Sequence, residues 1–342
     1  MAIPRSSDFT SATMLDQFDD MMSPPGLTNH WATVQVDHDV LAVRSLNVPP
    51  LSQGDSVSGR LYLDGRLAES YGQPVEVIWR PDRVERSTTI DGWDIRTTTI
   101  TPSDLPGVVV HIEVDNTTSE ERELDFGSWV HSTVVRSATP WLECLPPSGP
   151  NTLEAEGALR WATPKDGSQA VSLQALVHAS GEPVEDISDT DRIVRMRTRV
   201  AGGASWKGAW IHVLATDKAT ATEHFDAVRS ALEGSIEACE KAWDAELAQI
   251  FSTESGLYSG ALPEIHTSNK ALEKLYWWGA MGTVWFRRDN PASVLGRTYD
   301  TLMPRHWQTT TFIWDYALSS LVHAQLDPEV MRRQVSHWIS LD

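Results

Sequence analysis

Aromatic, basic and acidic side chains gather in one stretch near the end of the sequence: Tyr299, Arg305, Trp307, Trp314 and Asp315. Sugars present apolar C–H faces and a ring of hydroxyl groups, so their binding sites combine aromatic platforms with charged groups that make bidentate hydrogen bonds. Asp315 stands at the start of an otherwise apolar segment, where a carboxylate is costly unless it is paired or bound to a ligand. These residue types predict a sugar-binding site in this stretch.

Packing in a protein core is the alternative explanation, because aromatic helix starts also occur in ordinary cores. Residue types alone favour neither binding nor packing for Trp314 and Asp315, and the same holds for Arg305 and Trp307. Three further tryptophans lie on one predicted helix, where packing is the better explanation: Trp277, Trp278 and Trp285. The choice between binding and packing for Trp314 therefore depends on the motifs around it.

Two motifs in this region resemble those of a known group of enzymes. The first is Phe312-Ile-Trp-Asp-Tyr-Ala and the second is His323-Ala-Gln-Leu-Asp-Pro-Glu. They are similar to motifs of the six-hairpin α/α-barrel glycoside hydrolases, most of all family 63 (processing α-glucosidases and mannosylglycerate hydrolases), with the family 37 trehalases as relatives. In that group a Trp-Asp pair near the start of an early barrel helix binds the cleaved sugar, so the resemblance implies this role for Trp314 and Asp315.

The resemblance implies an inverting hydrolase that acts on an α-glucoside or an α-mannoside, and it is specific over residues 265–342. The general acid and base of the group lie in later barrel loops. The resemblance therefore implies that both lie beyond Asp342, that no residue of this chain is catalytic, and that the barrel is incomplete here. Phosphorylases of families 65 and 94 share this architecture, so phosphorolysis stays open, as does a non-catalytic sugar-binding or structural sandwich.

The sequence predicts neither a metal nor a cofactor. It contains no glycine-rich phosphate loop, no nucleophile elbow and no zinc motif. His306 and His323 have no ligand partner at metal spacing, and Cys144 and Cys239 form neither a metal pattern nor a disulfide framework. The first residues lack the basic and apolar regions of a secretory signal, which predicts a cytoplasmic location.

The 342-residue chain carries a net charge of −19 at pH 7. Such a charge repels phosphate backbones and anionic membranes, so the expected partner is an oligosaccharide or small glycoside and not a nucleic acid or a membrane. Residues 261–342 hold eight Lys and Arg against eight Asp and Glu, so the acid excess lies entirely in residues 1–260. The two parts therefore have different surfaces, and neither indicates an oligomeric state.

The elements that would position these residues change type along the chain. Short segments rich in Val, Ile, Thr and Trp, separated by turn residues, run from Asn29 to Asp217 and predict a large antiparallel β-sandwich. The predicted strands are Thr33–Leu41, Ser58–Leu63, Val75–Trp79, Val84–Ile90, Trp93–Ile100, Val108–Val114, Leu124–Val130, Ala170–His178, Ile193–Val200 and Ala209–Leu214. Asp91-Gly92 predicts a two-residue hairpin turn.

Apolar residues then recur at intervals of three and four, which predicts one long amphipathic helix, Lys218–Phe251. The later predicted helices are Lys270–Arg288, in which Gly279 and Gly282 suggest close helix packing, Phe312–Ala324, which is apolar enough to be buried, and one that opens at the capping residue Asp327. The predicted domains are residues 1–217 as sandwich, 218–264 as helical linker and 265–342 as the first helices of a barrel.

Overall fold

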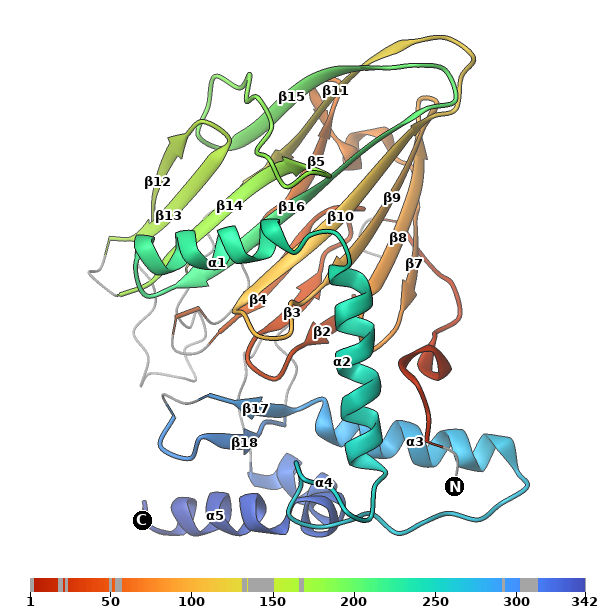
Figure 1. Ribbon diagram of the computed structural model, residues 1–342, viewed down its shortest axis with the longest axis vertical. Helices are drawn as coiled ribbons and strands as arrows, with labels where there is room; N and C mark the ends of the chain where they lie inside the picture. The colour runs from red at the N-terminus through yellow and green to blue at the C-terminus, as the bar shows by residue number, and fades with distance from the viewer. Residues whose placement is uncertain are drawn as a thin grey trace. The chain divides into compact units, whose positions relative to one another are not determined.

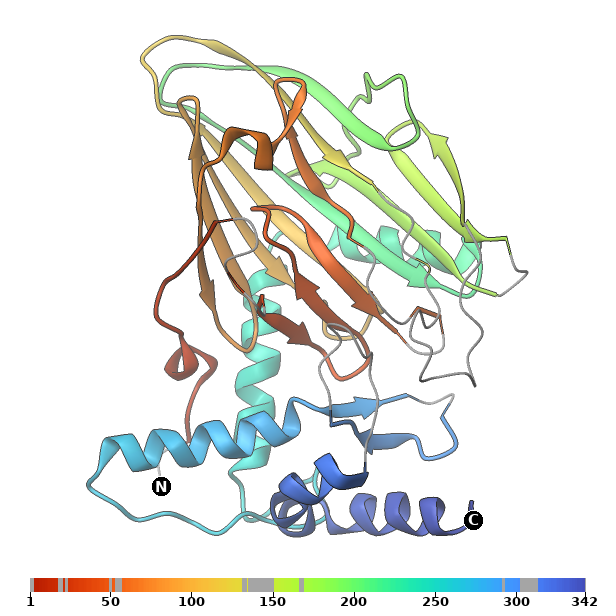
Figure 2. The ribbon, with the colours of Figure 1, turned by 180° about the vertical axis from the view of Figure 1, so that it is seen from behind.

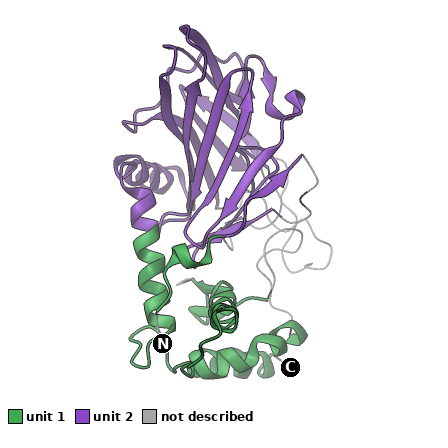
Figure 3. Cartoon of the chain, turned by 90° about the vertical axis from the view of Figure 1, so that its right-hand side faces the viewer, with its two compact units in different colours: residues 1–10, 240–303, 309–342 green, residues 11–239, 304–308 purple. Residues whose placement is uncertain are grey.

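A computed structural model describes residues 3–17, 21, 24–48, 51, 52, 57–130, 134, 151–165, 169–290, 293–301 and 313–341. The chain forms two compact units, which Figure 3 shows in green and purple. Unit 1 comprises residues 1–10, 240–303 and 309–342, and unit 2 comprises residues 11–239 and 304–308. The three-domain division stays a prediction.

Unit 2 contains three antiparallel sheets in the part of the chain that the structure describes (Figure 1). The nine-stranded sheet runs in the order β1 (Met14–Asp16), β7 (Val75–Trp79), β8 (Val84–Ile90), β9 (Trp93–Ile100), β10 (Gly107–Asn116), β16 (Ser205–Ala215), β14 (Val171–His178), β13 (Leu159–Pro164) and β12 (Asn151–Glu156). The four-stranded sheet contains β15 (Ile193–Val200), β11 (Arg122–Trp129), β5 (Arg60–Leu63) and β6 (Arg66–Leu67). The three-stranded sheet contains β2 (Gly26–Thr28), β3 (Thr33–Val36) and β4 (Val43–Asn47).

The predicted fold class, an antiparallel sandwich followed by helices, is confirmed. Phe126 of β11 packs against Trp206 of β16 with 5.3 Å between ring centroids, which joins the two larger sheets face to face. The hairpin of β8 and β9 turns at Asp91 and Gly92, whose φ angles of 47° and 80° are the positive values that such a turn requires. The predicted strand Thr33–Leu41 is too long, because β3 ends at Val36 and the chain then loops into β4.

That loop is held by a buried arginine on the inner face of the nine-stranded sheet. Arg86 of β8 is 2% exposed and donates hydrogen bonds to the carbonyl oxygens of Asp39, Leu41 and Ala42. It also donates to Thr99 Oγ1 at 3.0 Å. Burial lowers the pKa of Arg86 to about 10, and the Asp39 carboxylate opposes that shift, so the guanidinium stays charged at neutral pH. Figure 2, the view from behind, shows the three-stranded sheet in front of the nine-stranded sheet.

Two helices follow the sheets where one was predicted. Helix α1 (Lys218–Ser230) ends before Gly234, which has a φ of 83°, and α2 (Ser235–Ile250) begins at the next residue. A left-handed backbone breaks a helix, and glycine adopts it without strain, so the prediction of one continuous helix is wrong. The apolar spacing of three and four continues across the break, which is why periodicity alone missed it.

Helix α1 covers one end of the nine-stranded sheet (Figure 1). Its residues Ala221, Phe225 and Val228 pack with Val109, Ile211 and other side chains of β10, β14 and β16 in one buried cluster. The outward face of the sheet is therefore apolar beneath α1 and polar beyond it. The polar part is described below.

Unit 1 contains the later helices, and it includes the larger part of α2. Its other elements are the short 3₁₀ helix Ser6–Phe9, α3 (Lys270–Val284), a two-stranded sheet of β17 (Arg287–Asp289) and β18 (Arg297–Tyr299), α4 (Ile313–Leu326) and α5 (Pro328–Ile339). Trp243 of α2 stacks on Trp285 with 5.3 Å between ring centroids. Among the described helices, none has the length and apolar character needed to cross a lipid bilayer.

Helix α4 differs from its prediction in one respect. It was expected to be buried, yet Ile313, Trp314, Leu318 and Leu321 are all exposed. Its opposite face is buried through Tyr316, His323 and Leu326. Contiguous exposed apolar side chains of this kind often mark an interaction surface.

Gly279 and Gly282 do not mark close helix packing, so that prediction is wrong. A β-carbon added at either position would meet no described atom within 4 Å outside the helix's own backbone and the neighbouring residues. Their effect is therefore the intrinsic one of glycine in a helix.

We expect Gly279→Ala to stabilise unit 1 by about 0.5–1 kcal/mol, because alanine loses less backbone entropy in a helix interior than glycine. Urea unfolding of the two proteins measures the change. A destabilised variant would show that the space beside Gly279 is occupied.

Candidate functional site

Trp314 and Asp315 stand in the first turn of α4, where the sequence motif predicted them to act together. Trp314 is 71% exposed. Asp315 is half-buried, and its Oδ2 atom is enclosed but has no hydrogen-bond partner among the residues that the structure describes. An enclosed carboxylate oxygen without a donor has lost hydration and gained nothing in return. The pair thus combines an open aromatic face with an unused acceptor.

Tyr299 lies at the centre of a small core and not at a surface. Its side chain is 0% exposed, and its hydroxyl donates to Asp327 Oδ2 at 3.0 Å. Its ring lies 4.2 Å from that of His323, measured between centroids. A sugar cannot reach a ring that is enclosed by the protein core. The structure therefore favours packing as the role of Tyr299 over the predicted contact with a sugar.

His323 and Tyr316 are buried on the inner side of α4 with unused polar atoms. His323 is 1% exposed, and neither ring nitrogen has a hydrogen-bond partner in the described part of the chain. The same is true of the Tyr316 hydroxyl. Burial lowers the pKa of His323 to about 4, so the imidazole is neutral at pH 7. Buried polar atoms without hydrogen-bond partners lower the stability of the fold. The sequence did not indicate that these two side chains would be buried in this way.

Asp327 was predicted to cap the helix that follows it, and it occupies the N-cap position of α5, but its side chain makes no direct capping hydrogen bond. Its Oδ1 atom accepts a hydrogen bond from Ser259 Oγ at 2.8 Å, and Ser259 Oγ in turn accepts from the backbone N–H of Glu329 at 3.0 Å. The cap is therefore relayed through a serine that lies 68 residues earlier in the chain. Sequence spacing cannot reveal such a relay.

The remaining predicted residues are placed as follows. Arg305 and Trp307 lie outside the described residues, so their role in sugar binding stays a prediction. Trp277 and Trp285 are buried, as the packing interpretation requires. Trp278 is partly exposed and meets Phe9 edge to face, with 5.3 Å between ring centroids.

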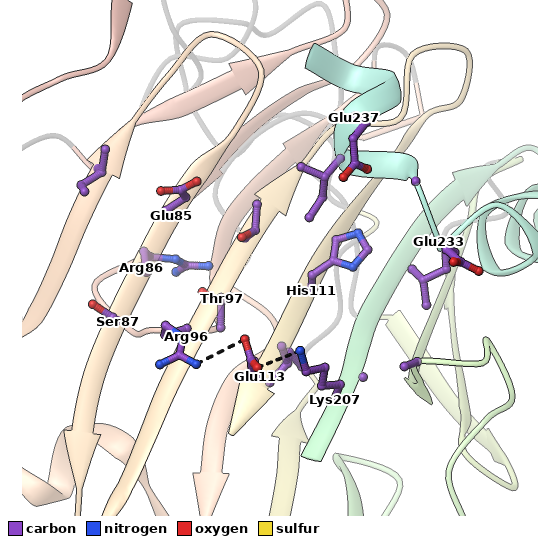
Figure 4. Close-up of a pocket in the computed structure, with 18 of the residues that line it drawn as sticks. Glu85, Arg86, Ser87, Arg96, Thr97, His111, Glu113, Lys207, Glu233 and Glu237 are labelled. Atoms are coloured by element: carbon purple, nitrogen blue, oxygen red, sulfur yellow. Dashed lines mark ion pairs between the residues drawn. The ribbon is translucent and has the colours of Figure 1, made fainter. Parts of the chain in front are cut away.

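Unit 2 contains a groove of about 900 Å³ on the outward face of the nine-stranded sheet (Figure 4). Strand register explains its floor, because directly opposed residues of antiparallel strands point to the same face. One row across β7, β8, β9, β10 and β16 consists of Glu76, Ser87, Arg96, Glu113 and Lys207. The next row consists of Ile78, Glu85, Thr98, His111 and Ala209.

The wall of the groove is the corner between α1 and α2. Leu232, Glu233, Gly234, Ile236 and Glu237 line it. The groove therefore lies at the step where the helix-covered apolar part of the sheet gives way to its polar part. The sequence predicted strands here, but it began the last of them at Ala209, whereas β16 begins at Ser205 and carries Lys207. It also did not indicate that β16 lies beside β10, and so it missed the groove.

Charge in the groove is arranged in two zones. Glu113 pairs with Lys207 at 2.8 Å and with Arg96 at 3.3 Å, and the hydrogen bond from Lys207 contributes to lowering the pKa of Glu113. His111 lies nearer the wall, and burial lowers its pKa to about 4, so it is neutral at pH 7 even beside Glu237. The cations thus occupy one row, while the wall side holds glutamates around a neutral imidazole.

His111 also joins the floor to the wall. Its Nε2 atom lies 2.8 Å from Ser235 Oγ, and that hydroxyl donates to the carbonyl oxygen of Leu232 at 2.9 Å. The serine oxygen therefore accepts from Nε2–H, which leaves the Nδ1 lone pair as an acceptor. Within the described residues, no group of three or more His, Cys, Asp or Glu side chains is arranged to bind a metal ion.

Comparison with known proteins yields only distant similarity. No family model matches the sequence, and no curated protein matches it. A solved structure described as a kojibiose phosphorylase from the human microbiome is 7% identical, with a TM-score of 0.45, over 70% of this chain and 38% of that chain. A bacterial glucoamylase complexed with acarbose is 8% identical, with a TM-score of 0.41, over 71% of this chain and 41% of that chain. The chain thus spans well under half of either structure, and function must be argued from the sites.

Proposed function

We propose that this chain belongs to a carbohydrate-active enzyme, a glycoside hydrolase acting on an α-glucoside or α-mannoside, in which Trp314 and Asp315 bind the sugar. The observation that carries the proposal is that the first turn of α4 holds both an exposed Trp314 ring and an enclosed Asp315 oxygen without a hydrogen-bond partner among the described residues. A sugar offers that pair what each lacks, because its C–H face covers an aromatic ring and its hydroxyls donate to a carboxylate.

The surroundings of the pair support a binding surface. Leu318 and Leu321 extend the exposed apolar face of α4 beyond Trp314. The buried face is held by Tyr316 and by the Tyr299–Asp327 hydrogen bond, so the first turn of α4 is carried by a packed core. A site carried by a packed element keeps its geometry better than one on a loop.

Asp315→Asn should weaken sugar binding by about ten- to a hundred-fold, because hydrogen bonds to a charged group are worth about 1.5–3 kcal/mol. Trp314→Ala should weaken it comparably through loss of the stacking surface. Calorimetric titration of the chain with kojibiose, nigerose, trehalose, mannosylglycerate and glucosylglycerate measures the affinities.

Leu275→Ala is the matched control, since it trims an exposed apolar side chain of another helix of unit 1, α3, and leaves the exposed face of α4 unchanged. Equal affinities for wild type and Asp315→Asn would remove Asp315 from the site. The same titrations with inorganic phosphate present test the phosphorolytic alternative, for which phosphate should raise the affinity for the sugar.

A further inference from the structure

The groove on the outward sheet face contains more negative charge than its own residues neutralise. Glutamates 76, 85, 113, 233 and 237 line it, against the cations Arg96 and Lys207, which gives a net charge of −3. Arg86 is counted with neither group, because its guanidinium points to the other face and binds the carbonyl oxygens of residues 39, 41 and 42. An occupant of the groove must therefore be cationic for its charge to be complementary.

The excess charge lies on specific side chains. Glu113 is neutralised by Lys207 and Arg96. Glu85 has only a distant pair with Arg83, at 3.9 Å. In the described part of the chain, Glu76, Glu233 and Glu237 form no ion pair. These three stand at opposite ends of the groove, on β7 and at the α1–α2 corner.

The spacing of these carboxylates rules out a point cation and fits an extended one. The floor crosses five strands, which is about 19 Å at the usual spacing between strands. Divalent cations need several oxygen atoms within 2–3 Å of one point, and the described residues offer no such cluster. Charges spread over this width match a ligand whose own charges are separated by spacers.

The apolar residues of the same groove indicate the chemistry of the segments that separate the charges of the ligand. Ile78 lies on the floor, on the same strand as Glu76, and Leu232 and Ile236 lie on the wall, where they adjoin Glu233 and Glu237 in the sequence. Aliphatic side chains cover methylene groups well. Among the described residues, no Trp, Tyr or Phe lines the groove, so they provide no aromatic platform of the kind that a sugar ring requires.

We propose that this groove binds a linear aliphatic polyamine, with its ammonium groups at the unpaired glutamates and its methylene segments on Ile78, Leu232 and Ile236. The molecule would lie along the row of Glu85, Thr98 and His111, away from Arg96 and Lys207. The Nδ1 lone pair of His111 accepts an N–H from the bound amine. This site belongs to unit 2 and is independent of the sugar site proposed on α4.

The experiment is calorimetric titration of the chain with spermidine at pH 7 and roughly 20 mM salt, where charge interactions are weakly screened. We expect saturable binding of one molecule per chain. Glu233→Gln combined with Glu237→Gln should weaken it by about tenfold or more, a loss of about 1.4 kcal/mol. Glu76→Gln alone should weaken it less, because it removes one charge at the far end.

The matched control is Glu120→Gln combined with Glu156→Gln, which removes the same charge from exposed positions outside the groove. This control should bind spermidine as the wild type does. Equal weakening in both double variants would assign binding to the general charge of the chain and overturn the proposal. So would tighter binding of Mg²⁺ or of kojibiose at Glu233 and Glu237 than of spermidine.

Discussion

Arg86→Met should destabilise unit 2 by about 3–5 kcal/mol, the usual cost of removing one partner from a buried charged network. The three carbonyl oxygens of residues 39, 41 and 42 and the Thr99 hydroxyl lose their shared donor, and none of them can reach water without opening the loop. The buried Asp39 carboxylate also loses the positive charge of Arg86, which helps to keep it ionised. The midpoint of thermal unfolding should fall by roughly 6–20 °C.

Chemical denaturation of unit 2 measures this loss, and Arg66→Met is its control. Arg66 is exposed, where it contacts Tyr71 and pairs with Asp91 at 3.9 Å, so its replacement should cost less than about 1 kcal/mol. Arg86→Lys should lie near Arg86→Met, because an ammonium cannot reproduce the planar fork that serves several carbonyls. Similar losses for Arg86→Met and Arg66→Met would mean that the loop is held by other contacts.

The sequence predicted the parts of the fold that depend on local rules. Strands β7, β8, β9 and β15 have the bounds that alternation and turn residues indicated, and the Asp91-Gly92 turn has the positive φ angles that its residue types favour. Each of these features is decided within ten residues of chain. The residue types there determine the backbone with little help from distant partners.

Features that depend on distant partners were missed. Strand β13 carries Arg160, and an arginine is usually exposed to solvent. Arg160 is nevertheless buried, because Asp186 and the carbonyl oxygen of Ile193 accept its hydrogen bonds. The groove forms only because β16 pairs with β10, about ninety residues earlier in the chain. Alternation indicated that His111 and Glu113 share a face, but not which strand would place Lys207 beside them.

The candidate sugar site shows the same division. The Trp-Asp motif predicted that Trp314 and Asp315 bind a sugar together, which stays a prediction, and both residues lie in the first turn of α4. Tyr299 carried the same chemical signal as Trp314, but its partners, His323 and Asp327, lie more than twenty residues away and enclose it. Aromatic and acidic types indicate what a residue can bind, and only tertiary contacts decide whether a ligand can reach it.

The free energy of unfolding of unit 2 should already fall at a pH well above the range in which its carboxylates titrate, because two histidines are buried as neutral groups. Burial lowers the pKa of His212 to about 3 and that of His111 to about 4, against an ordinary value near 6.5. The unfolded chain binds a proton at each site below pH 6.5, and the folded chain does not. Stability is therefore complete above pH 6.5 and falls as the pH drops toward 4.

At pH 5.5 each histidine should cost about 1.4 kcal/mol relative to pH 8, so the pair should cost about 3 kcal/mol. Urea unfolding at both pH values measures this difference.

Glutamine at position 212 keeps a polar group near the hydroxyl of Ser172, which lies 3.0 Å from His212 Nε2, but cannot take up a proton in this range. His212→Gln should therefore halve the contribution of the two histidines to the pH dependence of unit 2, and His212→Gln with His111→Gln should remove that contribution. Comparing each variant with itself at two pH values cancels any packing cost of the substitution. A double variant that keeps the wild-type slope would place the proton uptake elsewhere.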